Sequence, residues 1–147
     1  MEKIISVNRK ATHDYFIAEK YEAGIVLTAS EVKSCLNHEV NLQDSYISID
    51  KGRLVLHNAF IAKYFNATSW NHEERAKRFL LMHKREILRI NQKVKTKGFT
   101  LIPLCFYINN NKIKVEIGLC VGKHNYDKRE SLKDKQDKIE MMRKLKR

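Results

Sequence analysis

The sequence predicts a mainly β protein with flanking helices: a small antiparallel β-barrel followed by a disordered basic tail. Three features indicate this class: short β-branched and aromatic runs separated by turn signals, one long stretch of helical periodicity, and a loss of apolar residues after position 122. A chain of 147 residues suffices for one domain but not comfortably for two. We therefore expect one barrel domain over residues 1–122 and a tail over residues 123–147.

The first expected elements are two strands and a helix. Apolar runs at Tyr15–Ile17 and Ile25–Leu27 flank a polar stretch, the pattern of two strands with a tight connection. A helix is expected from about Ala29 to Leu36. Its start is indicated by Thr28 and Glu31, which have the capping-box spacing, in which each side chain satisfies a free backbone N–H.

A hairpin and a long helix are expected next. Two β-rich runs flank Asp50–Gly52, where the glycine allows a positive φ, and a short strand followed by a loop is expected over residues 59–70. From about Arg78 to Lys97 the pattern has a period of 3.6, with Gly98 placed as a C-terminal cap and cations on the other face. We interpret His83, on the apolar stripe, as a core or interface residue rather than a ligand. The stripe consists of Leu80, His83, Ile87, Ile90 and Val94, widened by Leu81 and Leu88.

The chain then returns to strands. Pro103 within FTLIPLCFYI favours an edge or a bulge, and Asn109–Asn111 favours a turn. The run KIKVEIGLCVG alternates apolar and polar residues, so one of its faces should be buried. Six or seven short antiparallel strands with two or three helices are typical of an OB-like barrel, the oligonucleotide-binding type.

The positive charge is concentrated in two segments. The chain has 29 Lys and Arg against 17 Asp and Glu, a formal net charge of +12. Residues 75–98 contribute +8 and residues 123–147 contribute +5, so the other 98 positions sum to −1. A solubilising surface would spread its charge, whereas segregated charge indicates a polyanionic partner such as nucleic acid or an anionic membrane surface.

The sequence offers little support for an enzyme, a metal site or a membrane protein. His72-Glu73 begins like the zinc-protease pattern H-E-x-x-H, but position 76 is alanine. No nucleotide or hydrolase motif is present, and scattered carboxylates of a nuclease are the remaining enzymatic alternative. Cys35, Cys105 and Cys120 form no CxxC pair, which predicts reduced, buried packing residues. No run approaches the ~18 apolar residues of a membrane helix. We expect a soluble cytoplasmic protein without cofactor, metal or membrane partner.

Three blocks resemble the SsrA-binding protein family, also called small protein B. These are Asn8–Phe16, Tyr21–Ile25 and Glu31–Ser34, at the spacing of the family pattern. The resemblance extends through Leu80–Ile87 and to Tyr126–Arg129, and so covers most of the chain. It implies an RNA-binding barrel that recognises the transfer-RNA-like domain of transfer-messenger RNA in bacterial trans-translation. The chain departs from the pattern at Asn37-His38-Glu39, at Glu74 and Ala76–Phe79, and at His124.

The candidate RNA-binding residues combine cations with polar and stacking groups. Cations neutralise phosphates, His13 can stack on a base, and Asn8 and Glu22 can hydrogen-bond base edges or 2′-hydroxyls. We expect residues 8–34, together with the region around Leu81 and Lys114, to form one RNA-facing surface, with Asn8, Arg9, Lys10, His13, Glu22 and Lys33 exposed. The candidates are Asn8, Arg9, Lys10, His13, Glu22, Glu31, Lys33, Leu81, Lys84, Arg85 and Lys114.

The tail has too few apolar residues to fold alone, so we expect it to be disordered when free and helical on a polyanion. The resemblance implies that this helix forms in the vacant messenger channel of a stalled ribosome, and that elongation factor Tu joins through the RNA complex. The candidate ribosome-binding residues are Lys123, Tyr126, Asp127, Lys128 and Arg129. The alternative function is that of a ribosomal or general RNA-chaperone OB-fold protein, which would bind many RNAs with little discrimination.

Overall fold

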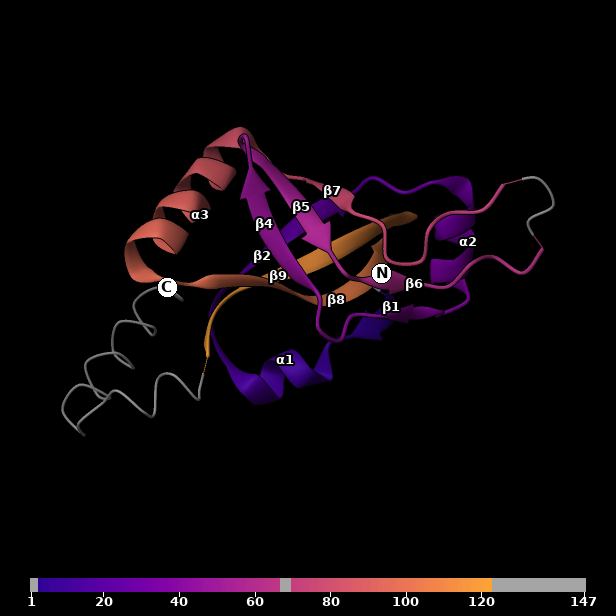
Figure 1. Ribbon diagram of the computed structural model, residues 1–147, viewed down its shortest axis with the longest axis horizontal. Coiled ribbons are helices and arrows are strands. Elements are labelled where there is room, and N and C mark those ends of the chain that lie inside the picture. The colour runs from indigo at the N-terminus through magenta and orange to yellow at the C-terminus, as the bar shows by residue number, and fades with distance from the viewer. Residues whose placement is uncertain (1–2, 67–69, 123–147) are drawn as a thin grey trace.

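A computed structural model describes residues 3–66 and 70–122 of the chain. Apart from a short ribbon of two strands, the strands belong to one sheet, and helices flank it (Figure 1). The elements in chain order are β1 (Lys3–Val7), α1 (Arg9–Asp14), β2 (Tyr15–Ile25), α2 (Ala29–Leu36), β3 (Val40–Asn41), β4 (Tyr46–Asp50), β5 (Arg53–His57), β6 (Phe60–Ile61), β7 (Arg78–Leu81), α3 (Lys84–Lys97), β8 (Thr100–Asn109) and β9 (Lys112–Gly122).

The main sheet closes on itself. Its order is β1-β8-β4-β5-β7-β2-β9, and β9 also pairs with β8, so six strands form a ring to which β1 is added. Each of these pairings is antiparallel, which confirms the predicted mainly β, antiparallel fold with flanking helices. In Figure 1 α3 and α2 lie at opposite ends of the strand assembly, and α1 covers a third side.

The core fills the ring and extends under α3. Phe106, Leu54 and Ile117 are fully buried, and α3 contributes Ile90 to the same cluster. A smaller cluster joins α1 to β8 and β9 and includes Cys120. Burial raises the pKa of the Cys35 and Cys120 thiols to about 12, so both stay protonated and serve as packing groups.

Turn chemistry follows the sequence expectation. The β4–β5 hairpin turns at Lys51 and Gly52, both with positive φ, and the β8–β9 hairpin turns at Asn110 and Asn111, again with positive φ. Two successive positive φ values match the type I′ turn, which suits the twist of a hairpin. The register shifts between Pro103 and Cys105, which confirms a bulge at the proline.

The prediction for the start of the chain is wrong in two respects. A single eleven-residue strand, β2, replaces the two short strands, because its polar stretch pairs with β9 and leaves Lys20 and Glu22 exposed. Helix α1 precedes β2. It was not predicted, because its six residues show no helical pattern of apolar residues. The predicted α2 is confirmed, including a capping box in which Thr28 and Glu31 each accept from the other's backbone N–H.

The predicted long helix begins six residues later than expected. Residues 78–81 form strand β7, with Arg78 and Leu80 buried and Phe79 and Leu81 exposed. The apolar and polar residues of this run fit the period of a strand as well as that of a helix. Pairing with β2 and β5 makes the run a strand. His83 lies exposed at the N-cap of α3, and Leu88 is 57% exposed, so neither belongs to the buried stripe. The cap at Gly98 is confirmed by its left-handed conformation.

Candidate nucleic-acid interface

A row of side chains crosses five strands on the outer face of the barrel. The register places Ile4 opposite Tyr107, Tyr107 opposite Lys114, Lys114 opposite Gly24, and Gly24 opposite Leu81. Residues directly opposed in antiparallel strands share one face of the sheet. We call these five residues the outer-face row. Ile4 and Leu81, at the two ends of the row, are both 56% exposed, whereas Lys114 is half-buried and Tyr107 is buried.

Gly24 keeps the middle of the outer-face row open. A Cβ at this position would lie 3.4 Å from the Leu81 Cβ, at the tight limit of van der Waals contact. Glycine thus allows β7 to pair closely with β2, and it adds no side chain between Leu81 and Lys114. The row therefore offers a shallow strip where a base or ribose can contact Leu81 beside a cation.

Glu22 adjoins the outer-face row, two residues before Gly24 and so on the same face. Its carboxylate accepts a hydrogen bond from the Tyr107 hydroxyl. Glu116 lies directly opposite Glu22, and Lys20 Nζ lies 3.9 Å from Glu116. Two opposed carboxylates are unfavourable in a sheet, and Glu22 remains exposed beside the row.

The cations of α1 lie at the other end of β2. Arg9, Lys10 and His13 are exposed, as predicted, but α1 directly precedes Tyr15 at the start of the strand. Lys10 Nζ donates to Asp44 over 2.9 Å, which raises the lysine pKa. These residues therefore form a group apart from the outer-face row, and the single surface expected from the sequence is divided.

The remaining cations lie on α2 and α3. Lys33 is exposed on α2, and its Nζ lies 5.2 Å from the centre of the Tyr64 ring. Lys84 and Arg85 are exposed at the start of α3.

Asn8 is buried, which contradicts its predicted exposure. Only 4% of the residue is accessible. Its side-chain oxygen caps α1 by accepting from the Ala11 N–H over 3.2 Å, and its amide donates to the carbonyls of Leu42 and Pro103 over 3.2 and 3.0 Å. Asn8 therefore holds α1 against β8 and positions the exposed side chains of that helix.

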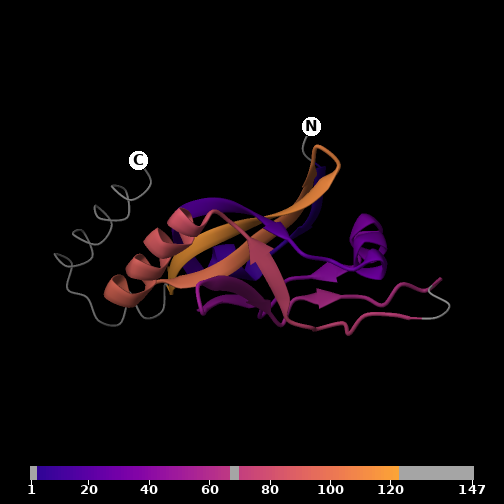
Figure 2. The same cartoon turned by 90° about the horizontal axis from the view of Figure 1, so that it is seen from above.

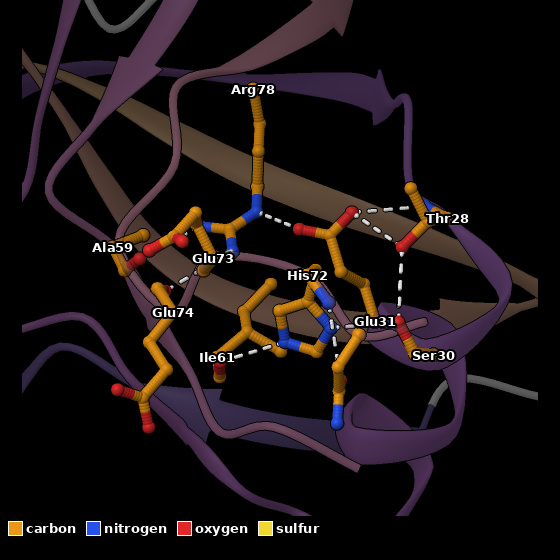
Figure 3. A network of polar contacts seen from close by, with 10 residues as sticks. Thr28, Ser30, Glu31, Ala59, Ile61, His72, Glu73, Glu74 and Arg78 are labelled. Atoms are coloured by element: carbon orange, nitrogen blue, oxygen red, sulfur yellow. Dashed lines mark hydrogen bonds and ion pairs between the residues drawn. The ribbon is translucent and has the colours of Figure 1, made fainter. Parts of the chain in front are cut away.

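Glu31 is buried as well, at the centre of the polar network in Figure 3. Its carboxylate accepts from Arg78 Nε and from the Thr28 N–H. Arg78 also donates over 2.8 Å to the carbonyl of Ala59, and to the carbonyls of Glu73 and Glu74. Burial alone would raise the Glu31 pKa, but the hydrogen bonds from Thr28 and Arg78 outweigh it and hold the pKa below its usual value. Glu31 is thus a structural residue in this fold.

His72 connects this network to Ser30 and Ile61. Its Nε2 donates to the Ile61 carbonyl over 2.9 Å, and its Nδ1 shares a hydrogen bond with the Ser30 hydroxyl over 2.8 Å. Within residues 3–66 and 70–122, no group of three His, Cys, Asp or Glu side chains could hold a metal ion. None of the helices described is long and apolar enough to cross a membrane.

Sequence reasoning missed a groove between β2 and α3. It has a volume of about 780 Å³ and is lined in part by Glu19, Tyr21, Arg89 and Lys93. Lys93, predicted on the exposed cationic face of the helix, instead donates to Glu19 over 2.7 and 2.9 Å. A register shift between Ile17 and Glu19 aims this carboxylate at the helix, and nothing in the local sequence signals that shift.

Comparison with known proteins identifies the family. The family model described as "SmpB protein" matches residues 5–147. The chain belongs to the SmpB family. The SsrA-binding protein of Sulfurihydrogenibium sp. (strain YO3AOP1) is 50% identical over 145 residues, which are 99% of this chain and 95% of the relative. That of Carboxydothermus hydrogenoformans is 53% identical over 132 residues, 90% and 89% of the two chains.

A solved SmpB structure shares the fold. A chain from "tmRNA-SmpB: a journey to the center of the bacterial ribosome" matches with a TM-score of 0.70 at 43% identity, covering 91% of this chain and 93% of that chain. The two chains therefore share the arrangement of their strands as well as their sequence motifs.

Proposed function

We propose that this SmpB family member binds the transfer-RNA-like domain of transfer-messenger RNA and delivers that RNA to stalled ribosomes. The observation that carries the proposal is the outer-face row with Glu22, which combines aliphatic, cationic and acceptor groups on a rigid sheet and leaves Leu81 exposed rather than packed. Its relatives are SsrA-binding proteins, and a related chain comes from a structure of tmRNA-SmpB and the bacterial ribosome.

Two sets of contacts would contribute differently to RNA binding, one to specificity and the other to affinity. The outer-face row and Glu22 supply specificity, because they can contact bases and 2′-hydroxyls. The cations of α1 and α3 supply affinity through phosphates, because each neutralised phosphate releases counterions. The net charge of +12 supports this division, since only part of it lies near the outer-face row.

We propose a second role for residues 123–147, which lie outside the described residues and carry a net charge of +5. In the messenger channel, Lys123, Lys128 and Arg129 would bind ribosomal RNA phosphates and Tyr126 would stack on an exposed base. The complex would then be accepted with alanyl-charged RNA and elongation factor Tu, without any catalytic step by this chain.

A tagging assay on ribosomes stalled on a truncated message tests both roles. The fragment 1–122 should bind transfer-messenger RNA like the full chain but should not support transfer of alanine to the stalled peptide. Tyr126→Ala, and Lys128→Ala combined with Arg129→Ala, should keep RNA binding and reduce tagging. Full tagging by the fragment would contradict the role of residues 123–147.

A competition assay separates the proposal from a general RNA-chaperone role. Labelled transfer-messenger RNA bound to the full chain is challenged with bulk transfer RNA and ribosomal RNA at one salt concentration. We expect neither competitor to displace it at equal concentration. Equal competition by all three RNAs would show a general RNA-binding protein and would overturn the proposed function.

A further inference from the structure

Two aromatic side chains are unusually exposed on the segment between β6 and β7. Phe65 is 74% exposed and Trp70 is 61% exposed, the largest fractions among the exposed large hydrophobic residues within 3–66 and 70–122. Neither ring contributes to the core clusters. Exposed aromatic groups on one segment indicate a binding surface rather than a packing function.

Hydrogen bonds hold together the residues next to the two rings, Tyr64 and Asn71. The Asn71 side chain bridges both backbone groups of Tyr64, accepting from its N–H over 3.1 Å and donating to its carbonyl over 3.0 Å. Phe65 directly follows Tyr64 and Trp70 directly precedes Asn71, so both aromatic residues are adjacent in sequence to this pair of hydrogen bonds. The Glu31–Arg78–His72 network of Figure 3 anchors the same segment to α2 and β6. A prearranged aromatic surface loses little conformational entropy on binding.

Two lysines bring positive charge to the part of the protein that carries these aromatic residues. Lys33 Nζ lies 5.2 Å from the centre of the Tyr64 ring, and the Tyr64 and Phe65 rings are tilted against each other at 5.2 Å. Lys63, which precedes Tyr64 in the chain, is exposed. An apolar protein partner would leave these cations without counter-charges, whereas single-stranded nucleic acid offers bases to the rings and phosphates to the lysines.

We propose that Phe65 and Trp70 form a second RNA contact, which stacks on unpaired bases while Lys33 and Lys63 bind the adjacent phosphates. The inference rests on the proposed function and deepens it, because it predicts that the bound RNA presents single-stranded bases at α2 in addition to the surface facing the outer-face row. Figure 2 shows α2 and the segment before β7 at the end of the molecule opposite α3. The contact therefore lies far from the α3 cations and is independent of them.

Tryptophan fluorescence of the full-length protein tests the stacking directly. The chain contains one tryptophan, so its intrinsic fluorescence reports on Trp70 alone. We expect quenching on titration with a short single-stranded RNA and with the transfer-RNA-like domain. A fully paired duplex with the same number of phosphates should bind through charge but quench much less. Equal quenching by single-stranded and duplex RNA would overturn the proposal.

Affinity measurements with labelled RNA provide the second test. Trp70→Ala and Phe65→Ala should each weaken binding of the single-stranded RNA about 5- to 150-fold, the range that corresponds to ~1–3 kcal/mol per stacked base. Trp70→Phe should keep most of the affinity because it keeps a ring. The matched control is Leu88→Ala, which removes a similarly exposed apolar side chain on α3 and should change nothing. Thermal unfolding should be the same for all four variants.

The outcomes separate this inference from the proposed function. If Glu22→Ala weakens binding of the transfer-RNA-like domain while Trp70→Ala binds every RNA like the wild type, the stacking contact is refuted and the proposed function stands. If transfer-messenger RNA shows no preference over bulk transfer RNA but single-stranded RNA still quenches Trp70, the stacking contact stands and the proposed function fails.

Discussion

Glu22 and Glu31 belong to the same stretch of family-like motifs, yet the fold gives them opposite environments. Glu22 is exposed on the outer face of β2, where it accepts a hydrogen bond from a tyrosine hydroxyl. Glu31 is 4% exposed and accepts from a buried arginine. A buried carboxylate must be matched by protein donors, whereas an exposed one can exchange water for a ligand. The comparison separates residues that build the fold from residues that are free to bind RNA.

The largest expected effect comes from breaking the buried pair. Glu31→Ala leaves the Arg78 guanidinium buried without its counter-charge and should lower the free energy of unfolding by about 3–5 kcal/mol. Urea denaturation measures it. Replacing both residues, as in Glu31→Leu with Arg78→Met, should recover part of the loss, because no unpaired charge remains. A loss below ~1 kcal/mol for the single variant would contradict the structural role.

Acid should weaken the Glu31–Arg78 pair by protonating Glu31, with a smaller loss of stability than the substitution Glu31→Ala. The folded-state Glu31 pKa lies below the unfolded value of about 4.3, so its stabilising contribution is present above that value and is lost as pH falls through the folded pKa. Denaturation measured from neutral to strongly acidic pH should therefore show a steeper acid loss in the wild type than in Glu31→Gln. Parallel acid profiles would show that Glu31 does not titrate with a depressed pKa.

Asn8 extends the comparison to a neutral group. Asn8→Ala removes the cap of α1 and the two hydrogen bonds to buried carbonyls, and should lower the free energy of unfolding by about 1–3 kcal/mol. Gln43→Ala, at an exposed position, is the control and should change stability by less than ~0.5 kcal/mol. Equal stability of both variants would contradict the capping role.

Glu22 should show the opposite pattern. Glu22→Ala should lower the free energy of unfolding by only about 1 kcal/mol, the contribution of the Tyr107 hydrogen bond, and yet weaken specific RNA binding, because it removes an exposed acceptor. Glu22→Gln tests whether the charge or only the acceptor is needed, and Glu39→Ala is the exposed control. Unchanged competition against bulk transfer RNA for Glu22→Ala would remove it from the interface.

The smallest effect per residue is expected on α3. Replacing Lys84, Arg85 and Arg89 together should flatten the dependence of log affinity on log salt by roughly 0.7 to 0.9 for each phosphate that is no longer neutralised. Specificity should remain, unlike in the Glu22 variants. Affinity measured over a series of salt concentrations checks this. An unchanged slope would show that this face of α3 is only solubilising.

Local signals predicted the elements that depend on a few neighbouring residues. The capping box of α2, the two hairpin turns and the glycine cap of α3 are confirmed, since each is decided within a single turn of the chain. The strand β7 and the continuous β2 were missed because strand pairing decides them, and their partners lie far away in the sequence. The same holds for the candidate site. The sequence named Leu81, Lys114 and Glu22 as candidates, but it did not show that Asn8 and Glu31 are buried, because burial depends on contacts with distant parts of the chain.

The sequence by itself determined the fold class, the SmpB family, the segregation of charge and the set of candidate RNA-binding residues. Each of these follows from composition, periodicity or motif spacing, which can be read without knowing any contact. Only the tertiary structure decided which of those residues are accessible. Closing the ring through β8 and β9 brings Ile4, Lys114 and Leu81 onto one outer face, and packing α2 against the segment before β7 buries Glu31 with Arg78. Both results depend on contacts between residues far apart in the sequence. These contacts form, and contribute to stability, only when the chain has folded.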